Sequence, residues 1–169
     1  IALTPGSSWK SKIWPSKNYA QLADILIKEL KAKVVLFWGP GEEKLIESIS
    51  SLMEKEPIIA PRTGLKELAS LISRCTLFIG SDSAPLHIAS SLSVPSIGLY
   101  GPTDPQRNGP YGSGNIAIKK DVSVLSCSRK DCRRCKRQDC MELITVEEVV
   151  KQVENRIKEL EVAGSKKWT

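Results

Sequence analysis

Short runs of apolar residues alternate along the chain with longer stretches in which apolar residues recur every three or four positions. The short runs are typical of strands buried on both faces of a sheet, and the longer stretches are typical of amphipathic helices. The runs that predict strands are Ile1–Thr4, Val34–Trp38, Pro57–Ala60, Thr76–Gly80 and Pro95–Tyr100. The stretches that predict helices are Lys17–Leu30 (with Ser16 expected as its N-cap), Glu42–Met53, Leu65–Ile72 and Pro85–Leu92.

This alternation of strand and helix predicts an α/β fold, a Rossmann-like parallel sheet with helices on both faces. Right-handed crossovers between parallel strands place the carboxyl ends of all strands at one edge of the sheet. Ligands of such sheets bind beyond that edge, so the loops that follow the strands are the expected functional residues.

The pattern changes after Tyr100. Residues 101–114 are rich in glycine and proline and are expected to form an irregular loop, and residues 115–125 are expected to hold one or two short strands. Thr145 and Glu148 fit a capping box that opens a helix running to about Leu160. We therefore expect one domain, residues 1–163, and a frayed tail, residues 164–169. Because Ile1 already belongs to a predicted strand, we interpret the chain as a fragment of a longer protein.

The net charge and the length of the chain limit the classes of ligand and partner that the sequence suggests. The chain has 169 residues and a net charge of +6, from 25 Lys and Arg against 19 Asp and Glu. This moderate excess suits anionic ligands or an anionic membrane surface and is weak evidence for nucleic acid. No apolar run approaches the roughly 18 residues that span a membrane, and no signal peptide is recognisable in the sequence.

Two loops have compositions that fit a phosphate or sugar ligand. The loop Thr4–Lys12 is rich in hydroxyl groups and carries two lysines, which would offer N–H groups and positive charge to phosphates; the alternative is a flexible connection with solvated lysines. The loop Trp38–Glu43 ends in two acids. Glu42 and Glu43 either accept hydrogen bonds from ribose hydroxyls or complement the dipole of the helix that they begin.

The loop Gly80–His87 combines a helix start with the sole histidine of the chain. Pro85 fits the first helical turn, and Ser83 or Asp82 is suited to cap it, so the N–H groups there would form an anion site. His87 either points to the same edge or is structural. No Walker A motif, no G-x-G-x-x-G after the first strand and no serine nucleophile elbow appears in the sequence, which argues against P-loop hydrolases and standard dinucleotide binders.

Together these loops resemble the carboxyl-terminal domain of the heptosyltransferase family (glycosyltransferase family 9), ADP-heptose glycosyltransferases of lipopolysaccharide core synthesis. The motifs that carry the resemblance are Ser81-Asp82-Ser83-Ala84-Pro85-Leu86-His87-Ile88-Ala89, Val94-Pro95, Leu99-Tyr100-Gly101-Pro102-Thr103-Asp104-Pro105, Lys12-Ile13-Trp14-Pro15 and Trp38-Gly39. The resemblance covers nearly the whole chain. It implies one half of a GT-B enzyme, the Rossmann-like nucleotide-sugar-binding domain, with the amino-terminal acceptor domain and its general base absent.

The resemblance also implies residue roles. Lys12, Asp82 and His87 would be the catalytic residues of this half. The donor would be bound by Ser7, Ser8, Lys12, Glu43, Asp82, Ser83, Ala84 and His87, and Glu42 is the alternative to Glu43 at the ribose. Many relatives have glycine where this chain has Ala84, and the extra methyl group would narrow the approach of the backbone to a phosphate.

The reaction implied is inverting transfer of heptose from ADP-heptose to the lipopolysaccharide inner core, with no cofactor required. The implied partners are a nucleotide sugar, a lipid A–core acceptor bound by the missing domain, and an anionic membrane, with no nucleic acid. The implied location is the cytoplasmic face of the inner membrane. Two alternatives remain: a GT-B transferase or epimerase with another nucleotide sugar, and a non-catalytic binding module.

A basic stretch with four cysteines, Cys127, Cys132, Cys135 and Cys140, is not explained by the resemblance. Four thiolates at this spacing fit a tetrahedral zinc site, and the gaps also match part of an iron–sulfur pattern. Free thiols and disulfides formed during purification are the other interpretations. The neighbouring basic side chains would also suit contact with anionic lipid.

Overall fold

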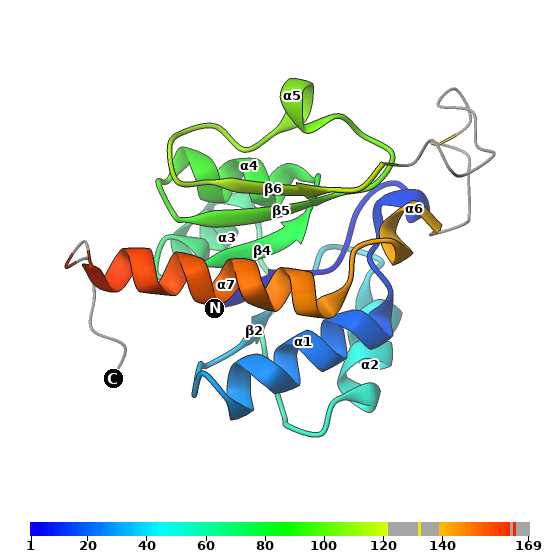
Figure 1. Ribbon diagram of the computed structural model, residues 1–169. Coiled ribbons are helices and arrows are strands. Elements are labelled where there is room, and N and C mark those ends of the chain that lie inside the picture. Colours follow the sequence, from blue (N-terminus) through cyan, green and yellow to red (C-terminus); the bar gives the residue numbers. More distant parts are fainter. Residues whose placement is uncertain (122–131, 133–138, 163, 165–169) are drawn as a thin grey trace.

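Six strands form one parallel sheet in the computed structural model of the protein, which describes residues 1–121, 132, 139–162 and 164 (Figure 1). The strands are β1 (Ala2–Thr4), β2 (Val35–Leu36), β3 (Ile58–Ile59), β4 (Phe78–Ser81), β5 (Ser96–Tyr100) and β6 (Ile116–Lys119). Their order across the sheet is β3-β2-β1-β4-β5-β6. The predicted Rossmann-like parallel sheet is therefore confirmed.

The chain reverses its direction of travel across the sheet between β1 and β4. β2 and β3 follow β1 on one side, and β4 then pairs with β1 on the other side. Thr4 at the end of β1 is paired with Gly80 of β4, so the loops that leave these two strands begin side by side. Such a reversal is the place where open α/β sheets bind their ligands.

Helices cover both faces of the sheet (Figure 1). They are α1 (Ser16–Lys28), α2 (Glu43–Leu52), α3 (Leu65–Ile72), α4 (Ala84–Ser91), α5 (Pro105–Asn108), α6 (Asp139–Glu142) and α7 (Val146–Val162), with a 3₁₀ turn, η1 (Lys10–Lys12). Side chains of successive strand residues point to opposite faces. Leu3 and Ile79 accordingly pack with α1, α2 and α7, whereas Ala2 and Phe78 pack with α3 and α4.

The apolar residues of the long helix α7 pack into the core of the domain. Val149, Val153 and Ile157 recur at helical spacing and are buried against the sheet and α1. The expected cap is present, because the N–H of Glu148 donates to Thr145 Oγ1 over 3.3 Å. The carboxylate of Glu148 pairs with Lys120 at 2.8 Å.

Two local predictions are wrong. Ser16 is the first residue of α1 and not its cap, because the carbonyl of Pro15 already accepts the N–H groups of Asn18 and Tyr19. The loop 101–114 is not wholly irregular, since Asp104 accepts the N–H of Gln106 and starts the single turn α5. The predicted tail, apart from residue 164, lies outside the described residues. Within the described part of the chain, no helix is both long enough and apolar enough to cross a bilayer.

Candidate functional site

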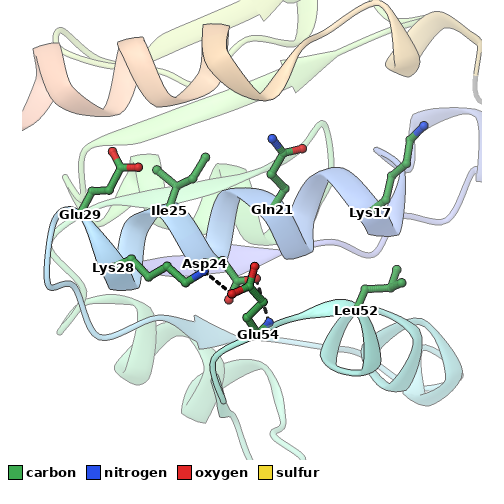
Figure 2. A pocket seen from close by; sticks show the side chains of 8 residues that line it. All are labelled: Lys17, Gln21, Asp24, Ile25, Lys28, Glu29, Leu52 and Glu54. Carbon is green, nitrogen blue, oxygen red and sulfur yellow. Dashed lines mark hydrogen bonds and ion pairs between the residues drawn. The ribbon is translucent and has the colours of Figure 1, made fainter.

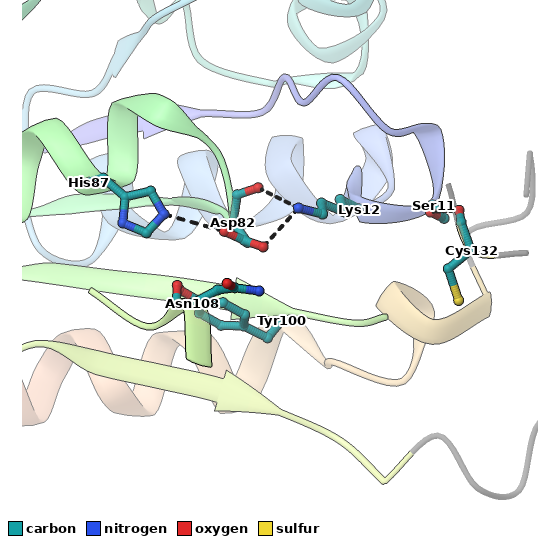
Figure 3. Close-up of polar contacts among 7 residues, drawn as sticks. All are labelled: Ser11, Lys12, Asp82, His87, Tyr100, Asn108 and Cys132. Atoms are coloured by element: carbon teal, nitrogen blue, oxygen red, sulfur yellow. Dashed lines mark hydrogen bonds and ion pairs between the residues drawn. The ribbon is translucent and has the colours of Figure 1, made fainter. Parts of the chain in front are cut away.

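The loops after β1 and β4 meet through a single ion pair. Lys12 is the last residue of η1, and its ammonium Nζ lies 2.8 Å from Oδ2 of Asp82, the first residue after β4. The same ammonium group donates to the backbone carbonyl of Asp82 over 3.3 Å. The two residues that the sequence analysis placed at one sheet edge are thus in direct contact (Figure 3).

The carboxylate of Asp82 contacts two basic side chains, those of Lys12 and His87. Its second carboxylate oxygen, Oδ1, lies 3.4 Å from Nε2 of His87, which is on the first turn of α4. The side chains of Lys12 and Asp82 are 13% and 8% exposed, whereas that of His87 is 44% exposed. The indole of Trp9 adds a cation–π contact, with the Lys12 ammonium 4.3 Å from the ring centroid. The cluster is therefore shielded on the protein side and open at His87.

A pocket of about 270 Å³ is formed by residues next to this cluster in sequence. Its wall combines hydroxyl groups, one carboxylate and apolar side chains from Thr4, Gly6, Ser7, Ser8, Phe37, Trp38, Gly39, Glu42, Leu68, Ser83, Ala84 and Pro85. The hydroxyl oxygens of Thr4, Ser7 and Ser83 are buried and have no hydrogen-bond partner among the described residues. Buried hydroxyl groups are normally paired, so these three are candidates for hydrogen bonds to a ligand.

Glu42, and not Glu43, supplies the carboxylate of this pocket. The backbone N–H of Gly39 donates to Glu42 Oε2 over 2.7 Å, which fixes the carboxylate beside Gly6. A side chain at Gly6 would overlap that carboxylate, so the missing Cβ makes room for it. Glu43 is the first residue of α2 and is exposed, and it does not line the pocket.

The amino-terminal end of α4 also faces the pocket. Ser83 occupies the N-cap position in extended conformation, but its side chain makes no capping hydrogen bond, contrary to one expectation from the sequence. Ala84 and Pro85 open the helix and line the pocket. Ala84 is thus one of the residues that line the pocket, and its effect on a ligand stays a prediction.

Comparison with known proteins identifies the family. The family model of glycosyltransferase family 9 (heptosyltransferase) matches residues 1–138. The chain belongs to this family. It is 37% identical over 136 residues to lipooligosaccharide heptosyltransferase 2 of Haemophilus influenzae, an alignment that covers 77% of this chain and 39% of the relative. The resemblance stated from the sequence motifs is thereby confirmed.

Solved structures of the heptosyltransferase family share the fold. A family 9 glycosyltransferase from Veillonella parvula has a TM-score of 0.81 at 32% identity, over 94% of this chain and 46% of that chain. The Escherichia coli heptosyltransferase WaaC, solved with ADP, has a TM-score of 0.75 at 20% identity, over 92% and 44% of the two chains. The chain also spans only about half the length of curated relatives that it matches.

Next to the ion pair lies Tyr100, the last residue of β5, which the sequence analysis placed at the end of a strand and in a family motif without a role of its own (Figure 3). Its hydroxyl donates to the carbonyl of Asn108 in α5 over 2.8 Å (Figure 3). Burial, and secondarily the negative charge of Asp82, raises the pKa of Tyr100. The neutral phenol of Tyr100 thus connects β5 of this heptosyltransferase-family chain to α5, next to the cluster of Lys12, Asp82 and His87.

A larger hollow, of about 360 Å³, lies between α1 and the residues after α2 (Figure 2). Three of its polar side chains, those of Asp24, Lys28 and Glu54, are already paired within the protein. Lys28 binds Glu54 at 2.5 Å, and the carboxylate of Asp24 accepts the N–H groups of Glu54 and Lys55 at 2.9 Å. None of the site residues expected from the sequence lines it, so it is not the candidate site.

The predicted metal site can be described only in part. Cys132 and Cys140 are buried, while Cys127 and Cys135 lie outside the described residues. Among the residues that are described, no group of three or more His, Cys, Asp or Glu side chains is arranged to hold a metal ion. Sequence reasoning missed Phe37 and Leu68 as pocket residues, because an apolar residue just after a strand or within a helix carries no signal of its own.

Proposed function

We propose that this chain binds the ADP part of ADP-heptose and that the protein transfers the heptose to the inner core of lipopolysaccharide. Membership of the heptosyltransferase family supports the reaction class, and the structure of WaaC with ADP, a protein of the same fold, supports the nucleotide. The observation that carries the proposal is local. Thr4, Ser7 and Ser83, whose buried hydroxyl groups have no partners among the described residues, line a pocket at the sheet edge where the loops of Lys12 and Asp82 meet.

The diphosphate would be bound where the loops after β1 and β4 meet. Ser7, Ser8 and Ser83 offer hydroxyl groups, and the uncapped amino-terminal end of α4 offers backbone N–H groups and the positive end of a helix dipole. Lys12 does not line the pocket, but it belongs to the same loop as Ser7 and Ser8 and would add positive charge to the site next to Asp82. This combination matches the hydrogen-bond acceptors and the negative charge of a pyrophosphate.

During transfer, the bond between the anomeric carbon and the diphosphate oxygen breaks, and its electron pair leaves with ADP. An acceptor hydroxyl oxygen forms the new bond to the anomeric carbon from the opposite face, and its proton passes to a base that we place outside this chain. Lys12 and the N–H groups of α4 stabilise the charge that builds on the diphosphate, each donor by about 3 kcal/mol. Asp82 and His87 would bind hydroxyl groups of the transferred sugar.

The ribose and the base would lie toward β2. The fixed carboxylate of Glu42 is suited to accept hydrogen bonds from ribose hydroxyls, so we assign this role to Glu42 and not to Glu43. Phe37, Trp38 and Leu68 provide the apolar part of the pocket. The indole N–H of Trp38 donates to the carbonyl of Ala60 over 2.7 Å, which holds this wall in place.

The acceptor lipid would bind to a second domain. The relatives are about twice the length matched here, which supports an acceptor-binding half outside this chain. Because the acceptor is a membrane lipid, we propose that the protein works at the cytoplasmic face of the inner membrane. The net charge of +6 is compatible with an anionic surface.

Calorimetric titration with ADP and UDP tests the nucleotide assignment. We expect ADP to bind and Lys12→Ala to weaken the binding by about tenfold or more, the effect of losing one hydrogen bond with a charged group. Lys44→Ala is the matched control, because Lys44 is an exposed lysine on α2. Tighter binding of UDP than of ADP would favour a transferase or epimerase for another nucleotide sugar. Absence of any nucleotide binding would contradict the proposal.

The four-cysteine zinc site remains a separate prediction. We propose that Cys127, Cys132, Cys135 and Cys140 hold one zinc ion, on the strength of their spacing alone. Elemental analysis of protein purified without oxygen tests it: one metal ion per chain is expected, and Cys127→Ser should remove it. A metal-free protein with four titratable thiols would support the free-thiol interpretation instead.

A further inference from the structure

The chain that ends the cysteine stretch packs against the turn that carries Lys12. α6 (Asp139–Glu142) lies next to η1 (Lys10–Lys12), as Figure 1 shows at the loop after β1. Met141 and Cys140 of α6 are buried and pack against Gly101, where they leave no room for a side chain. A part of the sequence with no place in the proposed reaction is thus in contact with the candidate site.

Two buried hydrogen bonds join these segments, one on each side of Lys12. Ser11 Oγ donates to the backbone carbonyl of Cys132 over 2.6 Å, and Ser11 is 2% exposed (Figure 3). Trp14 Nε1 donates to the backbone carbonyl of Ile144 over 2.9 Å, and Trp14 is fully buried. We call Cys132 together with Asp139–Ile144 the brace.

The turn η1 depends on such contacts. It is three residues long, its N-cap Trp9 makes no side-chain capping bond, and its backbone bonds are those from Lys12 to Trp9 and from Ile13 to Lys10. A 3₁₀ turn of this length has weak internal hydrogen bonds and does not hold its place without packing. The position of the backbone that carries Lys12 therefore depends on what η1 rests on, while the ammonium group itself is held by Asp82.

We propose that Ser11 is a positioning residue for donor binding, and that its hydrogen bond to the brace fixes η1 so that the Lys12 ammonium group stays beside Asp82, at the sheet edge where the diphosphate would bind. The inference rests on the proposed role of Lys12 in binding the diphosphate. It gives the end of the cysteine stretch a function that needs no metal ion: Cys132 acts through its backbone carbonyl.

The test is calorimetric titration of ADP into the protein at its full natural length, as wild type, Ser11→Ala, Lys12→Ala and the double variant. We expect Ser11→Ala to raise the dissociation constant by about tenfold, the loss of one well-placed charged hydrogen bond. In the Lys12→Ala background, Ser11→Ala should have no further effect, because nothing remains to be positioned. Ser11→Thr, which keeps the hydroxyl, should restore binding.

Ser51→Ala is the matched control. Ser51 also donates to a backbone carbonyl, that of Ser48 at 3.0 Å, but it is exposed on α2 and lies away from the brace, so ADP binding should not change. If the Ser11→Ala protein does not fold, Trp14→Phe replaces it: an aromatic ring of smaller volume remains, the hydrogen bond to the Ile144 carbonyl is lost, and the same dependence on Lys12 is expected.

The possible outcomes separate the two proposals. Weaker ADP binding in Lys12→Ala with unchanged binding in Ser11→Ala and Trp14→Phe overturns the brace alone. An effect of Ser11→Ala that is equally large with and without Lys12 also overturns it, because the residue would then act on the fold in general. Unchanged ADP binding in Lys12→Ala overturns the proposed role of Lys12 and the brace with it, whereas absence of ADP binding in the wild type overturns the proposed function.

Discussion

The ammonium group of Lys12 lies 2.8 Å from the carboxylate of Asp82, although 70 positions separate the two residues in the sequence. The contact lies where the strand order reverses, between β1 and β4. Both side chains are largely buried. Removing one partner of a buried pair leaves an uncompensated charge, so the pair matters for folding as well as for ligand binding.

The first prediction is that Lys12→Met lowers the free energy of unfolding by about 3 kcal/mol, because the Asp82 carboxylate then lacks its partner. Adding Asp82→Asn should recover part of this loss, since the unpaired charge is removed. Urea denaturation of the single and double variants measures both effects. The exposed pair Lys28–Glu54 provides the control, and Lys28→Met should change stability little. Strictly additive losses at Lys12 and Asp82 would contradict the prediction.

The second prediction separates the two neighbouring acids. Glu42→Gln should weaken ADP binding by about tenfold, because the fixed carboxylate is replaced by a neutral acceptor. Glu43→Gln should leave it unchanged, because Glu43 is exposed outside the pocket. Titration with 2′,3′-dideoxy-ADP completes the experiment: wild type and Glu42→Gln should bind it equally. An effect of Glu42→Gln that persists with this ligand would place the carboxylate elsewhere than at the ribose.

The third prediction concerns Gly6. Its absent side chain leaves room for the Glu42 carboxylate, so Gly6→Ala should displace that carboxylate and weaken ADP binding about as much as Glu42→Gln does. Gly39→Ala is the control, because its new Cβ would lie 3.5 Å from Glu42 Oε2, an ordinary contact. The unfolding free energy should change by about 1 kcal/mol or less in both variants. Calorimetry and urea denaturation give the two readings, and equal ADP affinity in Gly6→Ala and wild type would refute the prediction.

The sequence predicted the sheet well because its signals are local. Apolar runs and helical spacing mark β1 to β5 and the main helices, and the rule that parallel strands end at one edge was enough to bring Lys12 and Asp82 together. The two wrong local predictions occur where the start of a helix depends on a single residue. Ser16 was given the cap that the Pro15 carbonyl makes unnecessary, and Asp104 starts a helical turn inside a loop rich in proline and glycine.

The finer features of the site could not be predicted because they depend on contacts between distant segments. Which of Glu42 and Glu43 faces the pocket depends on the helix start and on the space above Gly6, and a shift of one residue reverses the answer. The bond from Ser11 to Cys132 joins residues 121 positions apart and involves a backbone carbonyl, which has no sequence signature. The apolar pocket residues Phe37 and Leu68 could not be predicted either, because both residues also fit an ordinary hydrophobic core.

The last prediction concerns alkaline stability. Burial is the main reason why the pKa values of Tyr19 and Tyr100 are raised above 10, and the negative charges of Glu42 and Asp82 add to the effect. Above about pH 10 the unfolded chain loses these phenolic protons while the folded chain keeps them, so the stability that the neutral phenols contribute is present below that pH and is lost as the pH rises. Each tyrosine should lower the unfolding free energy by up to about 1.4 kcal/mol per pH unit.

Urea denaturation between pH 8 and roughly 11.5, the range that brackets the unperturbed tyrosine pKa, measures this slope in wild type, Tyr19→Phe and Tyr100→Phe. Each phenylalanine variant should show a shallower loss of stability above pH 10, because one titrating group has been removed. Tyr100→Phe should also be less stable at neutral pH by about 1 kcal/mol, since the hydrogen bond to the Asn108 carbonyl is lost. A slope that is the same in all three proteins would mean that other groups, and not these buried phenols, control unfolding in alkali.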